Sequence, residues 1–405
     1  MHGRLPLFAA GSLLATALLL AASLDGAQAT VEPPGQRQPS ALKAPRVAPL
    51  PEAQWTDQHR QRVEKFAAYG APDNAFKTLL QLPEMVDGAM PFAIYLAEES
   101  SLAPREREIL ILRTAWLHGS PALWSRHAAR AATLGMSRAQ IRRVAQGADA
   151  GWDPPDATLL RLADELYRNS SVSDATWKIL AARFDLFHLM DAVETVNHFT
   201  FLSLLYNSFG VQPDAGSGES LPKDVPYRVT VPPRERPLAT ARVVPPEGRG
   251  IAVGRTFNMY PRLRDQWSPR QTFINRVSKL TPRHREMLIL RMGWNSRSEY
   301  EWAQHVGRVG RAREHGLEPV RIAEGPGAQG WTPEESAILR VADDLYSGGL
   351  VSDATWRTLS KTFDRGLLMS AVVPPRGYRA ISMSLNAYGV QLEPGDERFP
   401  LLPGR

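Results

Sequence analysis

The segment Leu102–Arg113 (LAPREREILILR) occurs twice in this chain, and it returns as Leu280–Arg291 (LTPRHREMLILR). In both segments a proline start signal precedes apolar residues at the spacing of a mostly buried helix. The repeated segment therefore predicts a helix, and its return predicts a duplicated domain.

The similarity extends well beyond this one helix. The offset, 280 − 102 = 178, places His127 on His305. Further matched segments follow in the same order: 163–167 (ADELY) with 342–346 (ADDLY), 172–177 with 351–356 (VSDATW in both), and 207–212 (NSFGVQ) with 386–391 (NAYGVQ). A long collinear repeat indicates two tandem domains rather than a short-period solenoid.

The hydrophobic period inside both copies is helical. Residues 156–167 and 334–346 carry apolar side chains at helical spacing, and Ser173 and Ser352 are suited to cap the helices that follow. No sustained alternation of apolar and polar residues is present, so we predict an all-α fold. Pro374-Pro375 interrupts a segment that is uninterrupted in the first copy, and this predicts a broken or kinked helix there.

Proline-rich stretches divide the chain. We predict an extended lead-in over residues 30–52, a first domain over 53–215 and a Pro/Gly-rich linker over 216–250. A second domain then covers 251–395, and a tail covers 396–405.

Composition and charge limit the classes of function. The chain has 405 residues, 43% of them hydrophobic and 22% charged, which is an ordinary globular composition with a length suited to two or three domains. The net charge of +6 comes from basic residues scattered among acidic ones. We interpret this as a solvated surface and expect no nucleic-acid partner.

The first 29 residues have the pattern of a cleavable signal peptide. Leu5–Leu24 is nearly all apolar, and Ala27-Gln28-Ala29 has the small-x-small pattern of a cleavage site. A mature chain beginning at Thr30 would be periplasmic or secreted, without stable membrane association. The alternative is an uncleaved anchor, because the apolar run approaches the roughly 20 residues that span a bilayer. The chain has no cysteine, so disulfides and a lipoprotein anchor are excluded.

Candidate chemistry is concentrated between Glu286 and His305. Glu301 and His305 are four residues apart and share a helix face, and Ser298 lies on the same stripe. A carboxylate one turn from an imidazole can fix its tautomer and raise its pKa. Glu286 would reach this stripe if its helix packs against the next as a hairpin, and Arg291 is suited to bind a carboxylate. The alternative is a surface pair of charged residues without function.

These residues carry a resemblance. The Arg285-Glu286 pair, Ile289-Leu290-Arg291, Tyr300-Glu301-Trp302-x-x-His305 and the Leu-Asn-Ala-Tyr-Gly-Val end (385–390) resemble the carboxymuconolactone decarboxylase family, whose superfamily also contains alkylhydroperoxidase D-like peroxidases. The resemblance covers nearly all of both copies. It implies compact all-α units that form oligomers, so two fused copies would make an internal pseudo-dimer, and a homo-oligomer is the expected assembly.

The peroxidase branch of that superfamily uses two redox cysteines between its glutamate and its histidine. In this chain the matching positions are Ser298 and Glu301 in the second copy, and Ser120 and Leu123 in the first. A hydroxyl cannot undergo thiolate redox chemistry, so a thiol peroxidase is not expected.

The resemblance to the decarboxylases implies a lyase acting on a small carboxylated lactone or carbonyl compound. Loss of CO₂ leaves a carbanion that needs a proton donor and a bound carboxylate. We assign His305, Glu301 and Glu286 as catalytic residues, and Arg291, Ser298 and Tyr300 as substrate-binding residues. A repurposed homologue, or a scaffold that only binds a small molecule, stays open.

The first copy retains Glu108, Arg113 and His127 but has Leu123 opposite Glu301. We expect this copy to be weaker or purely structural. His198 is most simply a core or interface histidine, although it would contribute to a composite site if it approached the opposite copy.

A metal site is a third hypothesis, because Glu301 and His305 could supply two ligands from one helix. His284, His315 or His198 would have to complete the shell, and nothing in the sequence brings them near. We therefore predict no metal and no cofactor.

Overall fold

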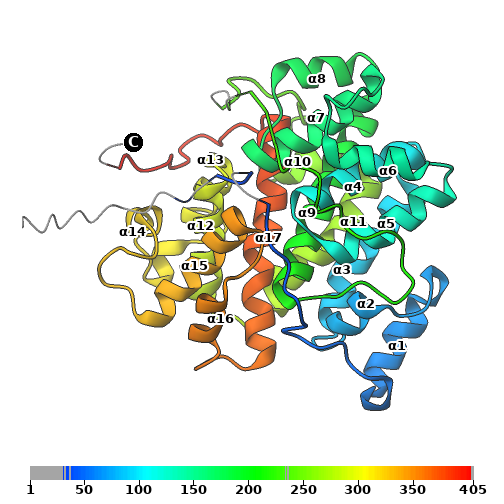
Figure 1. Ribbon diagram of the computed structural model, residues 1–405. Helices are drawn as coiled ribbons and strands as arrows, with labels where there is room; N and C mark the ends of the chain where they lie inside the picture. The colour runs from blue at the N-terminus through cyan, green and yellow to red at the C-terminus, as the bar shows by residue number, and fades with distance from the viewer. Residues whose placement is uncertain (1–30, 32, 36–37, 233, 235–236, 403–405) are drawn as a thin grey trace, which may run out of the picture.

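The computed structural model describes the chain apart from residues 1–30, 32, 36–37, 233, 235–236 and 403–405. The described part is helical and contains no strand, so the predicted all-α class is confirmed (Figure 1). Among the described residues, no helix has both the length and the apolar character needed to cross a membrane. The predicted signal peptide, residues 1–29, lies outside the described residues.

The first copy consists of nine α-helices. They are α1 Asp57–Lys65, α2 Asn74–Leu79, α3 Glu84–Ile94, α4 Pro104–Leu117, α5 Pro121–Thr133, α6 Arg138–Gln146, α7 Pro154–Asn169, α8 Asp174–Ala181 and α9 Leu186–Phe209. A short π-helix, Tyr95–Glu99, continues α3, and 3₁₀ turns occupy Glu52–Gln54 and Ala67–Tyr69.

The second copy has eight α-helices. They are α10 Ala252–Asn258, α11 Pro261–Thr272, α12 Pro282–Asn295, α13 Glu299–Val306, α14 Pro319–Glu324, α15 Pro333–Gly348, α16 Asp353–Leu359 and α17 Arg365–Tyr388. A π-helix, Phe273–Val277, follows α11, in the way that the first π-helix follows α3, and a 3₁₀ turn occupies Ala312–His315.

Local signals explain where the equivalent helices begin. Proline occupies the first turn of both α4 and α12, where its missing N–H is not needed. The carboxylates of Asp185 and Asp364 accept hydrogen bonds from the first turns of α9 and α17, and Ser173 and Ser352 cap α8 and α16 as predicted.

The repeated segment forms the centre of each copy. Helix α4 packs against α5, α7 and α9, and α12 packs against α13, α15 and α17. Both helices are buried around nearly their whole circumference, which is why their sequences lack the one-sided apolar stripe of a surface helix.

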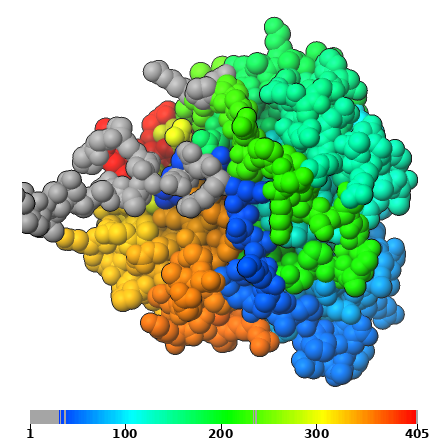
Figure 2. Space-filling view, in the orientation of Figure 1, coloured from blue at the N-terminus to red at the C-terminus, as the bar shows by residue number. Residues whose placement is uncertain are grey.

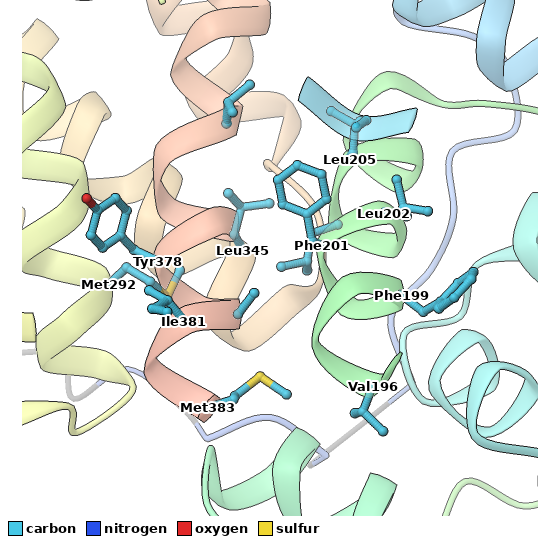
Figure 3. Close-up of a cluster of buried hydrophobic side chains, with 14 of the residues drawn as sticks. Val196, Phe199, Phe201, Leu202, Leu205, Met292, Leu345, Tyr378, Ile381 and Met383 are labelled. Carbon is cyan, nitrogen blue, oxygen red and sulfur yellow. The ribbon is translucent and has the colours of Figure 1, made fainter. Parts of the chain in front are cut away.

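The two copies pack through matched helices. Helix α9 lies along α17, and α11 lies against α3, so each contact joins equivalent parts of the two copies (Figure 1). Between α9 and α17 the side chain of Phe201 occupies the seam, whereas Phe199 and Tyr378 point away from it into their own copies (Figure 3). This packing is the one expected of an internal pseudo-dimer, which stays a prediction.

Helix α17 corrects one expectation. Pro374 and Pro375 lie inside a single helix that runs from Arg365 to Tyr388, so the helix is not broken. Both prolines are buried, and the tight packing of α17 against α9, α12 and α15 holds the helix together despite the two missing backbone donors.

The lead-in and the linker both lie over the other elements rather than away from them. The blue lead-in runs along the boundary between the two copies in Figure 2. Arg46 donates to the carbonyl of Val351 at 2.8 Å and to Asp353, both in the second copy. Arg242 of the linker makes the reciprocal contacts with Val172 and Asp174 of the first copy.

Candidate functional site

The centre of the candidate site is a carboxylate–imidazole pair. His305 Nδ1 lies 2.6 Å from Oε2 of Glu286, which is within hydrogen-bond distance. Glu286 stands near the start of α12 and His305 near the end of α13, so the antiparallel packing of these two helices brings the residues together. The expected hairpin of helices is therefore present.

Three further groups surround the pair. Glu301 Oε2 lies 3.6 Å from Nε2 of His305, and Arg285 Nε lies 3.3 Å from Oε1 of Glu286. The ring of Tyr378 meets the imidazole edge to face, with the ring centroids 4.7 Å apart. Glu286 rather than Glu301 thus orients the imidazole, which reverses the roles expected for these two carboxylates.

Burial and charge set the protonation of this cluster. Burial raises the pKa of Glu301 to about 7; His305 opposes this shift, and the nearby Glu286 carboxylate adds to it. Burial alone would lower the pKa of His305, but the charge and hydrogen bond of Glu286, together with Glu301, raise it above its ordinary value. Burial opposes ionisation of Glu286, yet His305 and Arg285 outweigh it and lower its pKa. One carboxyl is therefore held ionised, and the other is poised to exchange a proton near neutral pH.

The first copy contains the same pair with different neighbours. His127 Nδ1 lies 2.7 Å from Oε2 of Glu108, and the imidazole meets Phe199 edge to face at 4.9 Å. Arg130 Nε lies 3.3 Å from Oε1 of Glu108, so the arginine comes from α5 instead of α4. The replacement of Glu301 by Leu123 removes the second carboxylate but leaves the pair intact.

Two segments cover the site in the second copy. The turn after α13 passes directly over the pair, and a Cβ atom at Gly310 would overlap Oε2 of Glu286. The C-terminal segment 393–399 then braces α13: Asp396 accepts hydrogen bonds from Gln304 at 2.7 Å and from Arg308 at 3.0 Å. As a result His305 is only 3% exposed, against 9% for His127.

Arg291 has a structural role in this arrangement. Its guanidinium bonds both carboxylate oxygens of Asp343, at 2.6 and 3.0 Å, and the carbonyl groups of Ile322 and Ala323. Arg113 makes the equivalent bonds with Asp164 in the first copy. The expectation that Arg291 binds a substrate carboxylate is therefore not retained, because its donors are already engaged by the protein.

The other predicted residues are distributed around the cluster. Ser298 is buried at the N-terminus of α13, and its hydroxyl has no hydrogen-bond partner among the described residues. Tyr300 accepts a hydrogen bond from the backbone N–H of Val253 at 3.1 Å. His198 is fully buried against Phe92 and Phe201, and it belongs to the seam between the copies.

A cavity of about 350 Å³ opens beside the N-terminus of α13. Its lining comes from both copies and includes Glu299, Tyr300, Arg297 and Asn169. Glu286, Glu301 and His305 are not part of the lining, so this cavity approaches the site helix without reaching the carboxylate–imidazole pair. Within the described ranges, no cluster of three or more His, Asp or Glu side chains has an arrangement suited to a metal ion.

Two residues of the site were not predicted. These residues are Tyr378 and Arg285, and Arg285 entered the sequence analysis only as part of the repeated motif. The repeat carries a signal for Tyr378, because it aligns with Phe199 and both aromatic rings contact the histidine of their own copy. It carries none for Arg285, since Arg130 of α5 contacts Glu108 in the first copy.

Comparison with known proteins gives one match, and it lies in the first copy. Residues 83–165 match the family model described as Carboxymuconolactone decarboxylase family, and this range includes Glu108 and His127 of the first copy. No curated protein and no solved structure matches the chain.

Proposed function

From the premise that this chain contains a carboxymuconolactone decarboxylase family domain, we propose that it carries out acid–base chemistry, with decarboxylation favoured, on a small carboxylated lactone or carbonyl compound. The observation that carries the proposal is the Glu286–His305 pair with Glu301 beside it. The second copy is the principal site, since it alone has the additional carboxylate.

The proton chemistry follows from which ring nitrogen is occupied. Glu286 engages Nδ1 of His305, so Nε2 is the atom available to exchange a proton. In a decarboxylation the bond to the carboxylate carbon breaks, CO₂ leaves, and the electron pair stays on the substrate carbon. That carbon takes the proton from Nε2, and His305 recovers a proton from Glu301, whose raised pKa suits this transfer near neutral pH.

The surroundings support a site that excludes water. Glu286, Glu301 and His305 are all buried, and Tyr378 forms an aromatic wall against the imidazole. A charge that develops in such a place is stabilised by fixed protein groups more strongly than in water. A substrate would enter by displacement of the turn at Gly307–Gly310, which covers the pair.

A decarboxylation assay tests the proposal. It measures the turnover of carboxymuconolactone and related lactone acids by the chain from Thr30 onward. His305→Asn and Glu301→Gln should each lower turnover by roughly 10²-fold or more, the range typical of lost general acid–base catalysis. His127→Asn is the matched control in the first copy, and it should retain most of the activity. Equal losses in His127→Asn and His305→Asn would contradict the assignment to the second copy.

A binding scaffold without catalysis is the second candidate, and the depth of burial favours it. His305 is only 3% exposed, and the cavity beside α13 does not reach it. If well-folded protein turns over none of these compounds but binds one of them in calorimetry, this second candidate replaces the first.

Export is also part of the proposal. The pattern of residues 1–29 supports cleavage before Thr30 and a periplasmic or secreted mature protein. N-terminal sequencing of the protein recovered from its natural host tests this point, and an intact Met1 would contradict it.

A further inference from the structure

The seam between the two copies contains buried cationic and imidazole groups with unused hydrogen-bonding atoms. Arg270 of α11 is 1% exposed, and Nε, Nη1 and Nη2 all lack an acceptor among the described residues. His198 of α9 is fully buried, and neither ring nitrogen has a partner there. Arg376 of α17 contacts the same ring of Phe201 as Arg270 does. Among the described residues its one hydrogen bond is long, 3.5 Å from Nη1 to the carbonyl of Phe201, and its Nε has no partner.

Aromatic rings cover the flat faces of these groups. The Cζ atom of Arg270 lies 5.2 Å from the ring centre of Phe92 and 5.1 Å from that of Phe201. Arg376 lies 3.8 Å from the ring centre of Phe201, whose side chain occupies the seam in Figure 3. Stacking of this kind leaves the N–H groups at the edge of a guanidinium free to bind an anion.

Three other buried arginines donate several hydrogen bonds to the protein, although Nε of Arg379 has no partner among the described residues. Arg113 and Arg291 each bond an aspartate and two carbonyl groups, and Arg379 bonds the carbonyl groups of Tyr346 and Tyr167 at 2.7 and 3.0 Å. Arg270 differs from all three. An unpaired buried cation is strongly unfavourable, so its surroundings are expected to supply a negative charge.

The protein supplies little of that charge. The charge of Glu194 acts on Arg270 and opposes the lowering of its pKa by burial. Among the described residues, however, no ion pair within 4.0 Å joins Glu194 to Arg270 or to Arg376. Its Oε1 accepts hydrogen bonds from Ser384 at 2.5 Å and from Tyr388 at 3.0 Å, and burial raises its pKa. Among the described residues, the two guanidinium groups therefore have no paired carboxylate, and the Glu194 carboxyl that acts on Arg270 is itself biased towards the neutral form.

Divergence of the two copies created this cluster. Arg270 aligns with Phe92, since 270 − 92 = 178, and Arg376 aligns with Asn197, since 376 − 197 = 179. His198 in turn aligns with Gly377. The second copy thus places cations where the first has an aromatic ring and an amide, and the seam contains one such site rather than two related by symmetry.

We propose that a small monovalent anion, a halide or a small carboxylate such as acetate, binds in the seam between Arg270 and Arg376, beside His198. The full burial of all three side chains restricts the ligand to this size. Bound there, the anion links α11 and α17 of the second copy to α9 of the first, so it stabilises the pairing of the two copies. This site is separate from the proposed function and does not depend on it.

Thermal unfolding of the mature chain tests the proposal. Each salt replaces sodium HEPES, the only other electrolyte, so that the ionic strength stays constant. Sodium chloride, sodium bromide and sodium acetate are titrated in separate arms, which distinguishes a halide from a carboxylate. At least one arm should raise Tm by about 2 °C for each tenfold increase above the dissociation constant. Arg270→Met and Arg376→Met should abolish this dependence, whereas Arg311→Met, at an exposed arginine, should keep it.

A bromide-soaked crystal of the unaltered protein gives a second readout that does not depend on any variant folding. An anomalous peak within hydrogen-bond distance of Arg270 and Arg376 is expected if the halide arm is the responsive one; if acetate is, ordinary electron density should show it there. The same anion response in Arg270→Met as in the unaltered chain, or anions at the protein surface only, would overturn the proposal.

Discussion

Nη2 of Arg46 lies 2.5 Å from Oδ1 of Asp353, a residue 307 positions later in the chain. The same guanidinium donates to the carbonyl of Val351 at 2.8 Å and stacks over the ring of Trp356 at 4.8 Å. The lead-in to the first copy is thereby fastened to the second copy.

Arg46→Ala should lower the free energy of unfolding by about 1–2 kcal/mol, because it removes buried hydrogen bonds to carbonyl groups. Asp353→Asn is the matched control. It should lower the free energy of unfolding by less, since Asp353 is exposed and exposed ion pairs contribute little to stability. Urea unfolding of the three proteins measures both values. A larger loss in Asp353→Asn than in Arg46→Ala would show that the ion pair, not the carbonyl contacts, holds the lead-in.

Glu301→Gln should change how stability depends on pH. The pKa of Glu301 rises from 4.5 unfolded to about 7 folded, so the proton is bound more tightly in the folded state. The stability that protonated Glu301 contributes is present below pH 4.5 and is lost as the pH rises towards 7. The free energy of unfolding of Glu301→Gln should therefore rise relative to that of the unaltered chain over this window, by up to about 3 kcal/mol at pH 8.

Thermal unfolding from pH 4 to pH 8 measures that difference. Glu314→Gln, at an exposed glutamate, is the control and should follow the unaltered chain at every pH. A constant offset between Glu301→Gln and the unaltered chain would mean that Glu301 does not titrate in this range.

Glu286→Gln should lower the pKa of His305. The charge and hydrogen bond of Glu286 are the main contributions that raise this pKa against the effect of burial. An NMR titration of the imidazole Cε1–H resonances would show one histidine moving to a lower midpoint, identified by its absence in His305→Asn. Glu108→Gln serves as the matched variant of the first copy and should leave that resonance unchanged.

Gly310→Ala should separate Glu286 from His305. The added Cβ would overlap Oε2 of Glu286 and lie 2.5 Å from the backbone carbonyl oxygen of His305, so the turn or the pair must move. We expect a loss of stability of about 1–3 kcal/mol, as for other overpacked positions, together with loss of any turnover. Gly327→Ala is the control, because nothing lies near its new methyl group. Unchanged unfolding and turnover in Gly310→Ala would mean that the turn does not rest on the pair.

Much of this architecture was predictable because equivalent helices of the two copies have similar sequences. The matched segments predicted the central helices α4 and α12, and the hairpin that Glu286 needs in order to reach His305, stated as a condition from the sequence, is present. The break expected at the two prolines of α17 was wrong, since local propensity gives way to packing when a helix is held on several sides.

The site was less predictable, because which cations are already paired depends on contacts distant in sequence. Arg291 has the right chemistry for a carboxylate, but its partner Asp343 lies 52 residues away and takes that role. Arg270 showed no motif at all, and only the absence of a partner within the folded seam distinguishes it. Spacing along a helix could not reveal either fact.

The segment that braces α13 also comes after the described helices in the sequence. Asp396 and its neighbours follow α17 and so leave the ribosome after every helix that the structure describes. Chains generally fold from the N-terminus during synthesis. The carboxylate–imidazole pair of the second copy is consequently braced only after the described helices have been made, so a chain that lacks residues 393–399 would retain nearly all of its core and yet have an unbraced site.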